Sequence, residues 1–124
     1  MALVVQLENV TLRYGAGPEI LQHVSFDLAP GDLRLLCGKS GAGKSTLLRL
    51  LFLMLKPTSG AAHVFGQNVT KLSQKDVAHL RRKLGVVFQD FRLLPHMSVF
   101  DNVALPLRAA GLRREAYAGD VNDL

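Results

Sequence analysis

The stretch from Gly38 to Ser45 reads Gly-Lys-Ser-Gly-Ala-Gly-Lys-Ser and constrains the fold more than any other part of the chain. It fits the phosphate-binding pattern G-x-x-x-x-G-K-[ST]. Because glycine lacks a Cβ, the three glycines permit positive φ angles and a close approach of the backbone to a polyphosphate. Apolar runs flank the loop, Leu33–Cys37 before it and Thr46–Leu55 after it. They predict a buried strand and a buried helix, which is the context that the motif requires.

The residue types in the loop match the parts of a nucleoside triphosphate. Successive backbone N–H groups converge on one point, and the following helix adds the positive end of its dipole. Lys44 would carry its charge to the β- and γ-phosphates, and the Ser45 hydroxyl would ligate Mg²⁺. A glycine turn without a ligand is the alternative, and the flanking strand and helix argue against it.

Length, charge and cysteine content restrict the class of protein but do not identify its ligand. The chain has 124 residues, enough for one modest domain, and a net charge of +5. That charge suits a polyanion, whether nucleotide, nucleic acid or anionic membrane. Cys37 is the single cysteine, so it has no partner for an internal disulfide and a reducing compartment is expected. Because Cys37 lies in the predicted strand, we expect it to be a small side chain of the core. The longest apolar patch, Leu47–Leu55, is too short to span a bilayer, and the N-terminus lacks signal-peptide features.

Strand patterns surround the loop on both sides. Leu3–Arg13 and Ile20–Leu28 predict two antiparallel strands before it. This lead-in is longer than a minimal kinase core needs, which argues against a small P-loop kinase. Ala61–Phe65 and Gly85–Phe88 predict two further strands.

Three helices are expected after the loop helix. Ser73 is predicted to begin one, with Asp76 completing a capping box. Ser98 begins the next, which runs to about Ala110 with Pro106 inside it, and Arg113–Leu124 looks like the start of a third.

Two segments between these helices remain open to interpretation. The basic cluster Arg81–Lys83 would be a nucleic-acid patch or a solvated helix face. We favour the solvated face because no aromatic residues interleave for base stacking. The apolar loop Phe91–Pro95 would be either a contact site or packed against the protein.

The order of three elements resembles an ABC-type ATPase: Tyr14 ahead of the loop, the loop itself, and Gln89 after a short apolar run. Gly85–Pro95 and Ser98–Pro106 are most similar to the FtsE group, ATPases of bacterial cell division that work with a membrane protein of the FtsX type. The lipoprotein-release and macrolide-export ATPases share much of this layout. The implied fold is α/β, one ABC-type ATP-binding domain over residues 1–124. It would combine a P-loop NTPase core with an N-terminal antiparallel β subdomain and the start of a helical subdomain.

The resemblance implies a site for ATP and Mg²⁺. Tyr14 would stack on adenine, Thr46 would contact the α-phosphate, and Gln89 would ligate Mg²⁺ together with Ser45 and orient water. Lys44 and Gln89 are the candidate catalytic residues. The phosphates would be held by Gly38, Ser40, Gly41, Gly43, Lys44 and Ser45.

The resemblance also implies partners. An FtsX-type membrane protein would dock near Phe91–Met97, full-length relatives would dimerise, and the location would be the cytoplasmic face of the plasma membrane. No nucleic-acid partner is expected.

The family's signature motif, its second acidic strand, catalytic Glu and switch His have no counterpart in these 124 residues. The four histidines, at positions 23, 63, 79 and 96, lie outside the switch context. The sequence therefore resembles the first half of a family domain, ending within the helical subdomain. We expect nucleotide binding without turnover from this chain alone. The alternative from another class is a non-catalytic module that docks a membrane protein.

Overall fold

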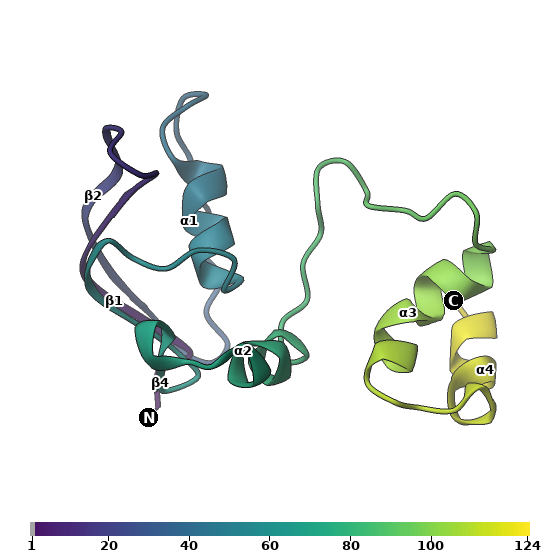
Figure 1. Cartoon of the computed structure of the whole chain (residues 1–124). Helices are drawn as coiled ribbons and strands as arrows, with labels where there is room; N and C mark the ends of the chain where they lie inside the picture. The colour runs from purple at the N-terminus through teal and green to yellow at the C-terminus, as the bar shows by residue number, and fades with distance from the viewer. Residues whose placement is uncertain (1) are drawn as a thin grey trace. The chain divides into compact units, whose positions relative to one another are not determined.

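The computed structural model describes residues 2–124, which divide into two compact units at the link between Leu84 and Gly85 (Figure 1). The first unit contains a β-sheet, the glycine-rich loop and the helices α1 and α2. The second unit contains a long connecting segment and the helices α3 and α4.

The first unit is built on a four-stranded antiparallel sheet in the order β2-β1-β3-β4. The apolar residues of β1 alternate toward the core, where Leu7, Val10 and Leu12 are almost fully buried. The two lead-in strands and the strand after α1 are confirmed, and a short strand that was not predicted, β4, follows them. The strands are β1 (Val5–Arg13), β2 (Glu19–Leu28), β3 (Ser59–Val64) and β4 (Gln67–Asn68).

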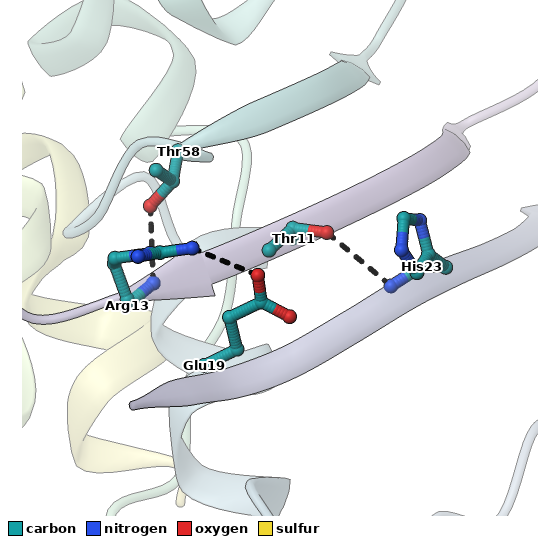
Figure 2. A network of polar contacts seen from close by, with 5 residues as sticks. All are labelled: Thr11, Arg13, Glu19, His23 and Thr58. Carbon is teal, nitrogen blue, oxygen red and sulfur yellow. Dashed lines mark hydrogen bonds and ion pairs between the residues drawn. The ribbon is translucent and has the colours of Figure 1, made fainter. Parts of the chain in front are cut away.

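Polar contacts hold the end of β1 against its neighbours, as Figure 2 shows. The Arg13 guanidinium pairs with the Glu19 carboxylate of β2 at 2.8 Å, and the Arg13 backbone N–H donates to the Thr58 hydroxyl at 3.0 Å. Further along, the Thr11 hydroxyl accepts from the His23 backbone N–H at 3.4 Å. The Arg13–Glu19 pair is exposed and contributes little energy. The Arg13 contacts lie at the last residue of β1, next to the turn that carries Tyr14.

The helix α1 (Lys44–Leu51) follows the glycine-rich loop and packs on the sheet. Its Leu47 and Leu50 join the core, while Leu48 on the opposite side is 57% exposed. The prediction of a buried helix therefore holds for one face only, because α1 is amphipathic. The helix also ends at Leu51 rather than Leu55, since Leu53 adopts a positive φ of 66° that stops the helical path.

A 3₁₀ turn (Val69–Lys71) leads to the helix α2 (Gln74–Arg81), which begins as predicted. The Ser73 hydroxyl accepts from the Asp76 N–H at 3.2 Å, and the Asp76 carboxylate accepts from the Ser73 backbone N–H at 3.3 Å, forming the capping box.

Of the three basic side chains at the end of α2, only that of Arg81 is held by hydrogen bonds within residues 2–124. The Arg81 guanidinium donates to the carbonyls of Phe52 and Leu53, and the Lys83 ammonium lies 5.9 Å from the centre of the Phe65 ring. The prediction of a solvated face holds for Arg82 and Lys83, which are exposed, and was wrong for the half-buried Arg81. Arg81 and Lys83 thus both contact other residues of the first unit.

Two predicted strands, Leu33–Cys37 and Gly85–Phe88, are not strands in the structure. A strand is defined by its hydrogen-bonded neighbour, and no segment among residues 2–124 pairs with either run. Leu33 is accordingly 88% exposed and Val87 98% exposed. The expectation that Cys37 is a buried core side chain was wrong for the same reason, because its thiol is exposed.

In the second unit, α3 (Val99–Ala109) and α4 (Arg114–Asn122) pack through Ala104, Tyr117 and Val121. As predicted, Ser98 caps α3, its hydroxyl accepting from the Asp101 N–H at 3.0 Å, and Pro106 lies within the helix. No helix among the described residues is both long and apolar enough to cross a bilayer.

The connecting segment of the second unit presents apolar side chains to solvent. Phe91 is 80% exposed and Leu93 is 67% exposed, so these two side chains are not packed against the protein. The Asn102 side chain of α3 braces the end of the segment by bonding the backbone of Leu94, Met97 and Ser98 at 2.8 to 3.2 Å. This favours the contact-site interpretation of the loop.

Candidate functional site

The glycine-rich loop adopts the backbone path that its glycines permit. Gly41 and Gly43 have φ angles of 81° and 99°, both in the left-handed region that glycine tolerates. At Gly43 space is also limiting, because an added Cβ would lie 3.1 Å from the Ile20 carbonyl oxygen of β2. Gly38 is not in that region, and a Cβ there would lie 3.3 Å from the Ala42 Cβ. The loop thus lies close to strand β2 at Gly43, and residues 38–42 are exposed.

The start of α1 leaves backbone donors free for a ligand. Gly43 is the N-cap and supplies no side-chain acceptor, and the first turn holds no acidic residue. The first N–H groups of a helix have no partner within the helix, so those of the first turn can serve an anion. The surroundings favour an anion as well, because residues 33–75 contain no Asp or Glu.

Lys44 holds its charge within the loop. Its Nζ donates to the carbonyl oxygens of Gly38 and Lys39, the second at 3.1 Å. An ammonium has three hydrogens, so a third direction stays available for a phosphate oxygen. This arrangement fits the role that the sequence predicted for Lys44.

Ser45 fits the predicted Mg²⁺ ligand in chemistry. Magnesium prefers oxygen ligands and keeps several waters, so a single protein hydroxyl beside phosphate oxygens suffices. Ser45 is exposed at the first turn of α1, and no hydrogen bond engages its hydroxyl among residues 2–124. No cluster of three His, Cys, Asp or Glu side chains exists in the same residues to offer a rival metal site.

The structure brings Tyr14 to the loop helix. Its hydroxyl lies 3.1 Å from the Thr46 hydroxyl, although the two residues are 32 positions apart. Tyr14 is 46% exposed, which leaves much of its side chain accessible, while Thr46 is buried. Sequence reasoning assigned both residues to the site but missed this contact, since no spacing rule predicts it.

Gln89 belongs to the second unit, where it is exposed in a turn. Beside it, Asp90 pairs with Arg92 at 3.2 Å, and the Arg92 guanidinium lies 4.4 Å from the centre of the Phe88 ring. The roles of Gln89 in Mg²⁺ binding and catalysis remain predictions.

Asp32 anchors the chain that leads into the loop. Its carboxylate accepts from the Ala29 backbone N–H at 3.0 Å, and this hydrogen bond, with a smaller contribution from Arg34, lowers the pKa of Asp32. The sequence did not reveal this role of Asp32.

The sequence also did not reveal the role of Arg81. It bonds the two carbonyls that follow α1 and so fixes the far end of the loop helix.

Comparison with known proteins identifies the family. The family model described as ABC transporter matches residues 21–123. The chain belongs to the ABC transporter family. The cell division ATP-binding protein FtsE of Escherichia coli is 43% identical over 108 residues, covering 87% of this chain and 49% of that protein. The methionine import ATP-binding protein MetN of Cupriavidus metallidurans is 40% identical over 124 residues, covering 98% of this chain and 36% of that protein.

A solved ABC structure shares the fold. The ATP-binding cassette MJ0796, a dimer in a post-hydrolysis state bound to ADP and Pi, superposes with a TM-score of 0.77 at 35% identity. The match covers 84% of this chain and 47% of that one. The α/β fold predicted for an ABC ATPase, with its N-terminal antiparallel sheet, is therefore confirmed. This ABC chain spans about half the length of FtsE and a smaller share of MetN.

Proposed function

We propose that this chain binds MgATP through the loop Gly38–Ser45 as the ATP-binding part of an FtsE-like ABC subunit. The observation that carries the proposal is the loop itself. Gly41 and Gly43 take left-handed φ angles, the first turn of α1 has no side-chain cap, and the Lys44 ammonium lies within the loop. Together these features supply donors and positive charge at one point.

In this proposal the chain is one ABC-type ATP-binding domain with the site residues predicted from the sequence. Tyr14 stacks on adenine, Lys44 contacts the β- and γ-phosphates, and Ser45 ligates Mg²⁺. Mg²⁺ supplies charge neutralisation between the phosphates. No general base is assigned, because the family's catalytic Glu has no counterpart among the 124 residues, so we propose binding rather than turnover for this chain.

The proposed partner is a membrane protein of the FtsX type, at the inner face of the membrane, in bacterial cell division. The similarity to FtsE supports this, and so does the exposed apolar surface of Phe91 and Leu93. The docking segment is Phe91–Met97. A second candidate, the ATP-binding subunit of an importer, is supported by MetN at 40% identity over 98% of the chain.

Binding is tested by titrating a fluorescent ATP analogue in the presence of Mg²⁺. We expect Lys44→Ala to weaken binding at least about ten-fold, equivalent to ~1.4 kcal/mol. Lys39→Ala is the matched control, because Lys39 is an exposed loop lysine whose side chain makes no hydrogen bond or ion pair within residues 2–124, and it should change the affinity less than about three-fold. Equal affinity of Lys44→Ala and the unmodified chain would refute the phosphate site.

The partner is tested by co-purification with a candidate FtsX-type protein or a methionine importer's membrane subunit. We expect retention by the FtsX type and its loss in a variant carrying Phe91→Ser and Leu93→Ser. Retention by the importer subunit instead would favour the second candidate.

A further inference from the structure

The hydroxyl groups of Tyr14 and Thr46 join two parts of the first unit that are distant in sequence. Tyr14 lies in the turn between β1 and β2, and Thr46 is the third residue of α1. Their oxygens are 3.1 Å apart, within the range of a hydrogen bond. Thr46 is 7% exposed and Tyr14 is 46% exposed, so one end of the contact is sheltered and the other end reaches solvent.

Hydroxyl chemistry suggests the direction of this bond. Each hydroxyl has one hydrogen to donate and two lone pairs to accept. A phenol is more acidic than an alkyl hydroxyl, so Tyr14 is the better donor and Thr46 the better acceptor. Among residues 2–124 no other hydrogen bond uses the Thr46 hydroxyl. When Tyr14 donates, Thr46 keeps its own hydrogen for another acceptor.

The contact also restricts the Tyr14 ring. Without it, the ring of a half-exposed turn residue is free to change rotamer, and ordering that ring on binding has an entropic cost. Gly15 follows with a φ of 58°, so the turn itself is tight while the side chain depends on its contacts. A hydrogen bond to a buried helix residue holds the ring at a set place relative to the loop.

We propose that Thr46 is a bridging residue that positions Tyr14: it accepts from the Tyr14 hydroxyl and donates to a phosphate oxygen. The Tyr14 hydroxyl is then a positioning group that sets the spacing between the aromatic ring and the phosphate loop. The site thereby selects a nucleotide, which carries a base at that spacing, over an inorganic polyphosphate. This inference rests on the proposed function, since it specifies how the same site recognises its ligand.

The test compares MgATP with magnesium tripolyphosphate, which has the phosphates and no base. Tyr14→Phe keeps the ring and removes the hydroxyl, so we expect MgATP affinity to fall about five-fold and tripolyphosphate affinity to change less than two-fold. A ring that stacks without help from its hydroxyl predicts no change for either ligand. Equal weakening of both ligands, or no weakening of MgATP, would overturn the proposal.

A double-mutant cycle tests whether the effect passes through Thr46. In Thr46→Val, which has no hydroxyl, adding Tyr14→Phe should cost less than two-fold in MgATP affinity. In Thr46→Ser, which keeps the hydroxyl, the five-fold cost should return. A five-fold cost in the valine background would show that the two residues act independently and would refute the bridge.

Two controls separate this outcome from others. Tyr117→Phe removes a tyrosine hydroxyl in the second unit and should leave the ratio of the two affinities unchanged. A general loss of folding lowers the affinity for both ligands alike, so it does not imitate the predicted change in ratio. If Lys44→Ala fails to weaken either ligand, the proposed function is refuted and the bridge with it.

Discussion

Replacing Arg81 with methionine is expected to loosen the end of the loop helix. The Arg81 Nε donates to the Phe52 carbonyl at 3.2 Å, and its Nη2 donates to the Leu53 carbonyl at 2.8 Å. These carbonyls follow the last residue of α1, where helix carbonyls lack partners and the helix dipole is negative. The guanidinium also lies 5.6 Å from the centre of the Phe52 ring.

The magnitude follows from these contacts. A hydrogen bond from a charged donor contributes about 1.5–3 kcal/mol when well buried, and both bonds here are partly buried. Both bonds come from one partly buried guanidinium, so we count the pair once, at about 1.5–2.5 kcal/mol. With about 0.5 kcal/mol for the cation–π contact, Arg81→Met should cost about 2–3 kcal/mol. Arg81→Lys should recover less than half of that, because an ammonium cannot reproduce the planar fork.

The assay is native-state hydrogen exchange at the amides of Leu47 and Leu50, which belong to the core face of α1. It reports on the first unit alone and does not require the two units to unfold together. Arg82→Met is the matched control, because Arg82 is the next residue and is exposed, and it should cost less than about 0.5 kcal/mol. If Arg81→Met and Arg82→Met lower the protection of these amides equally, the Arg81 hydrogen bonds at the end of α1 do not contribute to the stability of the helix.

Three further substitutions test other parts of the structure. Gly43→Ala should lower the free energy of unfolding by about 2 kcal/mol, because the new Cβ would approach the Ile20 carbonyl oxygen at a residue whose φ is 99°. Gly66→Ala is the control and should cost about 1 kcal/mol, because Gly66 has a similar φ of 76° and open space around it. Equal costs for the two substitutions would contradict the close approach at Gly43. The hydrogen bonds from Ser73 lower the pKa of Asp76 in the folded protein below its unfolded value of 3.8. The capping box should therefore stabilise α2 fully at pH values above 3.8, and this contribution should be lost as the pH falls through the folded pKa of Asp76. An NMR titration should detect this, and Asp76→Asn should remove the pH dependence. Asn102→Ala should raise hydrogen exchange in residues 94–98 while leaving α4 unchanged, and unchanged exchange there would contradict the bracing role.

Local chemistry explains why parts of the fold were predictable. The Ser73–Asp76 capping box and the Ser98 cap each depend on residues within three positions of one another. The turn geometry at Gly41 and Gly43 likewise follows from the absence of a Cβ. These features formed where the sequence placed them.

Non-local partners explain most of what was missed. Leu33–Cys37 has the composition of a buried strand, yet a strand forms only when it pairs with another, and no segment of the described residues pairs with it. The early end of α1 depends on Leu53 and on Arg81, which is 28 residues away from Leu53 in sequence. The Tyr14–Thr46 contact is non-local in the same way. Periodicity carries no information about such pairs.

Backbone amide NMR during titration with MgADP tests whether the loop Gly38–Ser45 holds the phosphates of a nucleotide. We expect the largest shifts at Gly41, Gly43, Lys44 and Ser45, because their N–H groups lie in the loop and at the start of α1. Shifts at Thr46 and around Tyr14 should follow at the same nucleotide concentration, while the amides of α4 stay unchanged. Saturable binding that shifts α3 and α4 and leaves the loop amides in place would contradict the account.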